Sequence, residues 1–405
     1  MDKIRHWLIS KYQTFVSSIA FIPGFISLGF LVLAALIFSF DLTDTGQQIK
    51  SDIPWLSIKD PSTARSILGA IAGGIISLTV FSFSMVMIVL NQAASQMSNR
   101  VLDKLIGNRF QQIVLGIYIG TIIFTFFLFS TIRETEDAFQ IPSLSIFLLT
   151  VITVIDIFIF IYFLHYITQS VKYDVIIERI KTSTFDGMKH FCIESLEDSV
   201  ERDFAAHSIV RASQSGIFEG FDDKEMLKFL SENECSMLSV HPIGTYILRG
   251  QPIAKCSRKL EDDQMEEALL GIILSNQESV ERNYEYGFRQ LSEIALKALS
   301  PGINDPGTAI ISFRAIVDLL GYRAVHFPPS VLSDKGGPFK IYRNELSFDD
   351  LFERAICPIW DYGKEDRMIR REFKLLLNQL SLVISSKPLT NLLDQVEKAI
   401  AGVSN

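Results

Sequence analysis

The chain has 405 residues, of which 48% are hydrophobic and 21% are charged, and its formal net charge at pH 7 is −8. Its mean hydropathy is positive, which is unusual for a soluble protein. The first 169 residues carry equal numbers of acidic and basic side chains, so the negative charge belongs to the remainder. An acidic soluble half argues against nucleic acid as a partner.

Four apolar segments are long enough to cross a bilayer. They cover about residues 15–40, 67–90, 113–132 and 143–166. No later run is long enough to span, so we predict a transmembrane domain over residues 1–170, surrounded by the lipid bilayer. The first run is too long for the core of a signal peptide, and we interpret it as a retained anchor.

Basic residues beside the spans predict the topology. Nine Lys and Arg residues lie near the spans on the side of the two termini, and four lie on the opposite side. This imbalance favours a multi-pass protein whose two termini are both cytoplasmic.

The second span belongs to a run, residues 66–99, that contains no Asp, Glu, Lys or Arg. As one helix the run would measure about 51 Å, against about 30 Å for the hydrocarbon core. Polar side chains recur every seven residues within it, at Ser77, Ser84, Asn91 and Ser98. Ser95 adds a further polar group. Residues seven apart differ by about 20° around a helix, so these side chains form one polar seam.

Two functions fit this seam. It could be a packing face, because small residues let membrane helices approach and hydroxyls can bond to their own helix. The nearby Gly69, Gly73 and Gly74 fit that interpretation. It could also line a pore that several copies of the helix surround. The polar end of the run, residues 91–99, favours the pore.

The fourth span contains a single acid, Asp156. A carboxyl group inside a membrane is a functional-site hypothesis: it could bind a cation, carry a proton or pair with polar groups of the second span. The alternative is a structural acid that is protonated or hydrogen-bonded, because burial disfavours the charge.

After the fourth span we predict a linker helix and a small β-rich part within residues 171–260. Strand candidates lie at 207–212, 217–221, 236–241, 246–248 and 253–256. Asp222 is a plausible cap of a short helix over 222–230. The segment Ile243–Ile253 is similar to the hammerhead turn of biotinyl and lipoyl carrier domains, which implies a small β-barrel or sandwich. The Met-Lys-Met attachment site of those carriers is missing, so no covalent cofactor is expected.

Residues 261–405 are predicted to form a helical part. A long helix or a helix pair covers 261–300, and further helices cover 348–357, 364–384 and 389–401. The helical segment 261–300 runs into a turn motif with Ser300, Pro301, Gly302, Asn304, Asp305 and Pro306. Pro301 and Gly302 stop one helix, and Asp305 can cap the next. Asn304 and Asp305 could instead hold a metal or a small molecule, and we favour the turn.

Several segments resemble one protein family. Tyr286–Leu291 followed by Ala298–Pro306 closely resembles the signature of a bacterial family of predicted membrane proteins, catalogued as domain of unknown function 2254. Val80–Ser84 and Ser95–Arg100 are also similar to that family. The resemblance implies four spans and a cytosolic domain, and it implies no activity.

The fold class that we predict is an α-helical membrane protein with a cytosolic α+β domain. No phosphate loop, zinc-protease helix, nucleophile elbow or dinucleotide fingerprint occurs in the sequence, so no enzyme, cofactor or metal is expected. The four cysteines have no paired spacing, which gives no indication of a disulfide framework or a zinc site.

Our leading hypothesis is an ion channel or channel-like conduit in the inner membrane, formed by a homo-oligomer and passing inorganic ions. The second span would line the pathway, Asp156 would contribute to it, and the cytosolic domain would assemble or gate it. The alternative is a membrane-anchored sensor or scaffold whose cytosolic domain binds a partner or small ligand.

Overall fold

The computed structural model describes residues 20–53, 56, 58, 60–96, 109–132, 141–193, 204, 206–276, 278–280, 282–333 and 337–402, with the backbone alone for 93–96. The chain divides into two compact units. Residues 1–172 are called the membrane unit below, and residues 173–405 the C-terminal unit.

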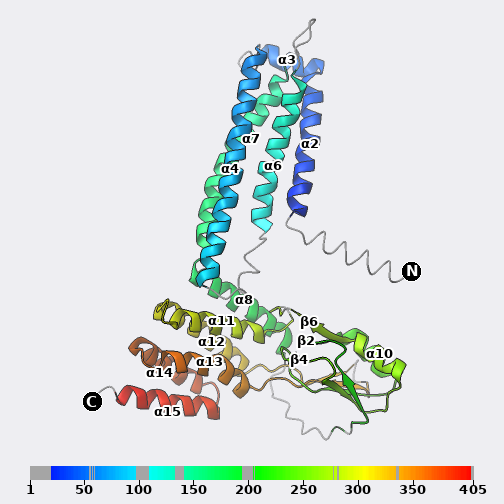
Figure 1. The fold of residues 1–405 in the computed structure, drawn as a ribbon, viewed down its shortest axis with the longest axis vertical. Coiled ribbons are helices and arrows are strands. Elements are labelled where there is room, and N and C mark those ends of the chain that lie inside the picture. Colours follow the sequence, from blue (N-terminus) through cyan, green and yellow to red (C-terminus); the bar gives the residue numbers. More distant parts are fainter. Residues whose placement is uncertain are drawn as a thin grey trace. The chain divides into compact units, whose positions relative to one another are not determined.

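Four long helices of the membrane unit run side by side (Figure 1). They are α2 (Phe21–Asp41), α4 (Pro61–Gln96), α6 (Arg109–Thr131) and α7 (Ser143–Ser170). Among the described residues, four helices are long and apolar enough to cross a membrane. This confirms the four predicted spans.

The boundaries of these helices follow local hydrogen bonds. Helix α4 begins at Pro61, six residues before the predicted span, because Asp60 caps it and accepts a hydrogen bond from the Thr63 amide at 2.8 Å. A short helix that the sequence analysis did not predict, α3 (Asp44–Asp52), follows α2. Its cap is Thr43, whose hydroxyl accepts from the Gly46 amide.

Helices α2 and α6 pack closely because α6 has two glycines one turn apart. A Cβ atom at Gly120 would lie 2.6 Å from Cγ of Phe30, and one at Gly116 would lie 3.0 Å from Cα of Pro23. Small residues four apart let two membrane helices approach until their backbones nearly touch. The core of the membrane unit extends from this contact to Leu68 of α4.

A buried acid ties one end of the bundle together. Asp41, the last residue of α2, is fully buried and pairs with Lys50 of α3 at 2.8 Å. Its other oxygen accepts from the amide of Ser145 at 3.0 Å and from the hydroxyl of the same residue. Asp41 therefore connects three helices and satisfies an amide at the start of α7.

The β-rich part of the C-terminal unit contains two sheets. The strands are β1 (Ser208–Arg211), β2 (Gly216–Phe221), β3 (Met237–Ser239), β4 (Tyr246–Ile247), β5 (Pro252–Cys256), β6 (Ile272–Ser275), β7 (Val331–Ser333) and β8 (Lys340–Tyr342). The larger sheet has the order β1-β5-β3-β8-β7, and the smaller has β4-β2-β6. Two short helices, α9 (Asp223–Glu232) and α10 (Asp262–Leu270), accompany the sheets.

Neither sheet closes into a barrel, so the barrel that the hammerhead resemblance implied is not observed. The two sheets share one core, to which Phe218 and Ile253 contribute from different sheets. The hammerhead-like segment explains the separation. Gly244 and Gly250 both have positive φ, and the chain reverses at them so that β4 and β5 enter different sheets.

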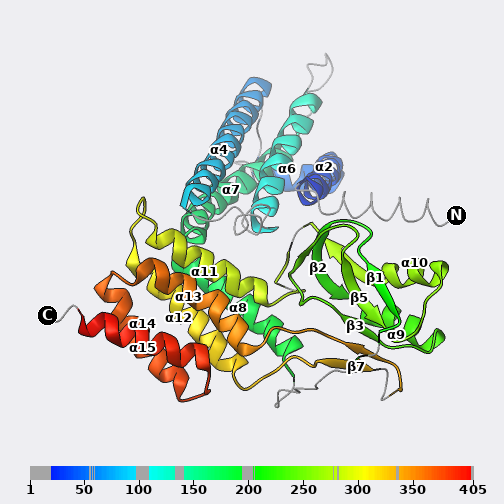
Figure 2. The same ribbon diagram turned by 60° about the horizontal axis from the view of Figure 1, so that its bottom comes forward.

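The remaining helices of the C-terminal unit pack beside the β-rich part (Figure 2). They are α8 (Tyr173–Phe191), α11 (Glu285–Leu299), α12 (Pro306–Arg323), α13 (Phe348–Gly363), α14 (Arg367–Ser381) and α15 (Lys387–Ala401). Gly287 of α11 touches the Thr184 side chain of α8, and Phe313 stacks on Phe373 with ring centroids 4.0 Å apart. The predicted linker helix corresponds to α8, which ends at Phe191, and residues 194–203 lie outside the described ones.

Candidate functional site

The polar seam of α4 faces away from the other described helices of the membrane unit. Ser77, Ser84 and Asn91 are all exposed. A Cβ atom built on Gly69 or Gly73 would meet no described atom of the chain within 4 Å. The seam therefore does not pack inside its own bundle. The face is not wholly polar, because the large apolar side chains of Val80, Phe81 and Ile88 are also exposed along α4.

The serine hydroxyls of the seam bond to their own helix. Ser77 donates to the Gly73 carbonyl at 2.8 Å, and Ser84 donates to the Val80 carbonyl at 2.9 Å. Bonds of this kind lower the cost of a hydroxyl in an apolar environment. The side chain of Ser95 and the whole of Ser98 lie outside the described residues, so the seam is traced as far as Asn91.

Asp156 does not belong to the seam. It is fully buried in the bundle, next to Thr121 and Tyr118 of α6. Ser82 of α4, which lies beside the Tyr118 hydroxyl, completes the group. Ser82 is 5% exposed, and it lies two positions from the exposed Ser84 on a different side of the helix. Among the predicted pathway residues, Asp156 thus lies apart from the exposed seam. It belongs to a buried oxygen cluster, defined as Ser82, Tyr118, Thr121 and Asp156.

Sequence reasoning named Asp156 and did not find its neighbours. Tyr118 and Thr121 are three residues apart, which places them on one face of α6. Polar side chains on one face of the span, which Thr125 continues one turn after Thr121, were the available signal. Which helix this face meets is a tertiary contact that no periodicity reports.

A cavity of about 260 Å³ lies beside the oxygen cluster, between α4, α6 and α7. Ser82 and Tyr118 line one part of it, and Gln111 and Gln112 line another. Seven residues separate Gln111 from Tyr118, which is about 10 Å along a helix. The cavity therefore extends from the cluster toward the start of α6, past apolar side chains such as Val86 and Phe163.

The motif at residues 300–306 forms the turn between α11 and α12. Asp305 accepts from the Thr308 amide at 3.1 Å and from its hydroxyl at 2.6 Å, and these bonds lower the pKa of the Asp305 carboxyl. Pro306 is the first residue of α12, and Asn304 has the positive φ of a turn residue. Ser300, Pro301 and Gly302 end α11. The geometry is that of a helix stop and a cap.

The comparisons with known proteins agree with this layout. A family model described as "Predicted membrane protein (DUF2254)" matches residues 16–379. The chain belongs to this family. The DUF2254 match includes residues of both the membrane unit and the C-terminal unit.

Curated DUF2254-like relatives come from mycobacteria. An "Uncharacterized protein" of Mycobacterium tuberculosis (strain ATCC 25618 / H37Rv) and one of Mycobacterium bovis are each 25% identical over 339 residues, covering 79% of this chain and 64% of the relative. The chain thus spans less than two thirds of their length. No solved structure matches.

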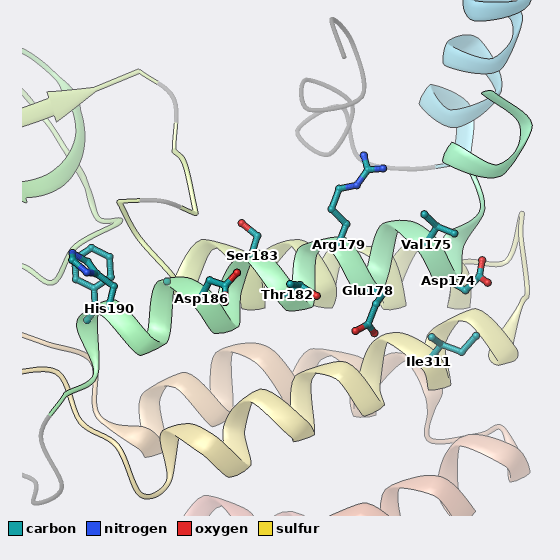
Figure 3. Close-up of a pocket in the computed structure, with 11 residues that line it drawn as sticks. Asp174, Val175, Glu178, Arg179, Thr182, Ser183, Asp186, His190 and Ile311 are labelled. Atoms are coloured by element: carbon teal, nitrogen blue, oxygen red, sulfur yellow. The ribbon is translucent and has the colours of Figure 1, made fainter. Parts of the chain in front are cut away.

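The C-terminal unit of this DUF2254 protein has a wide groove of about 1070 Å³ along α8. Asp174, Glu178, Arg179 and Asp186 line it, and Ile311 of α12 adds to one wall (Figure 3). The lining side chains come almost entirely from one helix, and they carry both signs of charge.

A buried acid lies at the start of α11 in the same unit. Burial, together with the charge of Glu345, raises the pKa of Glu285 to about 8, and Arg354, Arg323 and Arg289 oppose the shift. Arg323 is itself buried and donates to the carbonyls of His326 and Leu346. The family signature at Tyr286–Leu291 therefore follows a buried acid in a core that also contains a buried arginine.

Proposed function

We propose that this DUF2254 protein is an oligomeric channel or channel-like conduit for inorganic ions in the inner membrane, without enzymatic activity. In this proposal α4 of several copies lines the pathway, both termini are cytoplasmic, and the C-terminal unit assembles or gates the pore. The supporting observation is that Ser77, Ser84 and Asn91 face out of their own bundle. Polar groups in a membrane helix need protein or water beside them.

The length of α4 is consistent with this arrangement. At 36 residues it measures about 54 Å, which exceeds the hydrocarbon core of a bilayer. Its exposed polar groups extend to Asn91, near the end that leaves the apolar region. A second copy of the chain would give the seam the neighbour that its own subunit does not provide.

The test is ion flux through liposomes that contain the purified protein. We expect flux in the wild type and a severalfold lower flux in Ser84→Leu and Asn91→Leu, because a large apolar side chain narrows and dries a pore. The matched control is Phe158→Leu, since Phe158 of α7 is 67% exposed and lies outside the seam. Liposomes that stay tight at high protein load, across several ions and voltages, would contradict the proposal.

The second candidate is a membrane-anchored sensor or scaffold, and the groove along α8 favours it. Here the C-terminal unit binds a partner or small ligand, and the seam is a packing face. This function predicts that seam variants alter the stability of the protein, and that neither the wild type nor the variants pass ions through liposomes. It also predicts that charge reversal at Arg179 in the groove weakens the binding of a partner.

A further inference from the structure

The buried oxygen cluster contains more acceptors than its surroundings satisfy. Both carboxylate oxygens of Asp156 are buried without a hydrogen bond from the described residues, and so are the side-chain oxygens of Ser82, Tyr118 and Thr121. Three helices bring these five atoms together. Buried polar atoms without partners are costly, so a group of them in one place calls for a ligand.

The charges around Asp156 do not neutralise it. Within the described residues, the side chains that interact with its carboxyl are those of Thr121 and Tyr118, and both carry neutral hydroxyls. No Lys, Arg or His of the described chain contributes. A carboxylate in an apolar bundle must take up a proton or a cation.

A protonated carboxyl and a bound cation require different spacings between the surrounding oxygens. Hydroxyls around a protonated carboxyl normally bond to it and to one another at about 2.7 Å. Oxygens that surround a cation at about 2.4 Å lie roughly 3.4 Å apart when they are at right angles to one another. Thr121 lies near enough to stabilise the Asp156 carboxylate, and Ser82 lies beside the Tyr118 hydroxyl, yet none of the five oxygens has a hydrogen bond of ordinary geometry to a described group. This arrangement is compatible with a cation among the oxygens.

We propose that Asp156, Thr121, Tyr118 and Ser82 bind one monovalent cation of the size of Na⁺ inside the bundle of each subunit. One carboxylate and three neutral hydroxyls carry a single negative charge, so a monovalent ion gives a neutral site. A divalent ion would leave a net positive charge among apolar side chains, at high cost. The cluster and the seam lie on different sides of α4, so the site does not depend on the proposed pore.

The neighbouring cavity gives the ion a route to the cluster. Ser82 and Tyr118 belong both to the cluster and to the cavity wall, and Gln111 and Gln112 line the other part of the cavity. An ion that enters beside the glutamines would pass Val86 and Phe163 before it reaches Asp156.

The experiment measures labelling of Asp156 by an apolar carbodiimide in the full-length protein, with peptide mass spectrometry as the readout. The reagent attacks a protonated carboxyl, so a bound cation protects it. We expect Na⁺ at ten times its Kd to slow labelling about tenfold relative to choline at equal ionic strength. Asp41, which is paired with Lys50, serves as the internal reference whose labelling does not depend on Na⁺.

Two matched variants separate binding from folding. Thr121→Val removes a cluster hydroxyl and should shift protection to at least about tenfold higher Na⁺, the change expected for the loss of one ligand. Thr125→Val removes a hydroxyl that is equally buried on the same helix but already donates to the Thr121 carbonyl at 2.7 Å. It should leave the protection unchanged.

Labelling that depends on pH alone, equal in Na⁺, K⁺ and choline, would show that a proton neutralises Asp156 and would overturn the site. The midpoint of thermal unfolding gives a reagent-free second measurement: Na⁺ should raise it in the wild type and in Thr125→Val, and less in Thr121→Val. Identical wild-type midpoints in the three salts would overturn the site as well. Loss of flux in Ser84→Leu with Na⁺ protection intact would separate this site from the pore.

Discussion

The α2–α6 contact and the outer face of α4 are built from the same kinds of residue, with opposite results. Pro23 and Phe30 of α2 occupy the space beside Gly116 and Gly120 of α6. Gly69 and Gly73 of α4 are also four residues apart, and no described atom covers them. A small-residue pattern thus marks where a helix can be approached closely, and it does not say by which molecule.

The largest expected effect is on the packed side, at Asp41. Asp41→Asn removes a charge that Lys50 needs inside the bundle, and breaking a buried pair in this way costs about 3–5 kcal/mol. We expect a large fall in the thermal unfolding midpoint of the detergent-solubilised protein. On the open face, Asn91→Ala should leave that midpoint unchanged, because Asn91 is exposed. Equal effects of the two variants would remove the distinction between the faces.

A smaller effect compares the glycines directly. Gly120→Val forces a side chain into the Phe30 ring and should destabilise the subunit by about 1–3 kcal/mol, the usual cost of overpacking. Gly73→Val meets open space within the subunit, so it should spare the subunit's unfolding midpoint and lower the oligomer size measured by light scattering. An unchanged oligomer in Gly73→Val would show that α4 does not contact other copies there.

A further comparison concerns a buried acid of the C-terminal unit, Glu285, and the pH dependence that its protonation gives to stability. The pKa of Glu285 is about 8 in the folded protein, which is above that of an ordinary glutamate. Its protonation therefore stabilises the folded state, and this contribution is fully present below the pKa of the unfolded state. Stability should therefore fall as the pH rises from about 4.5 to 8. Glu285→Gln should flatten this part of the thermal unfolding profile, and parallel profiles for the two proteins would contradict the shift.

Hydropathy predicted the four spans because a membrane helix satisfies its own backbone, so its signal is local. The cap by Asp305 and the short helix after Asp222 were also predicted, and Asp222 does accept from the Glu225 amide. These features depend on a few neighbouring residues.

The contacts between distant segments could not be predicted in this way. Strand β8 pairs in parallel with β3, with Met237 opposite Ile341, and β6 lies inside the segment that was expected to be helical. The oxygen cluster is a similar case, since Ser82, Thr121 and Asp156 come from three helices. A single sequence indicates which face of each helix carries polar or apolar side chains. It does not indicate which two faces pack against each other.

The hydroxyl geometry of α4 limits what can cover it. The hydroxyls of Ser77 and Ser84 donate their hydrogen bonds to carbonyls of their own helix, so each presents an acceptor oxygen to its surroundings. An anion finds no donor in these two side chains, and an apolar surface leaves both oxygens unpaired. In the proposed oligomer, water, a cation or a donor side chain of another copy would each pair with these acceptor oxygens.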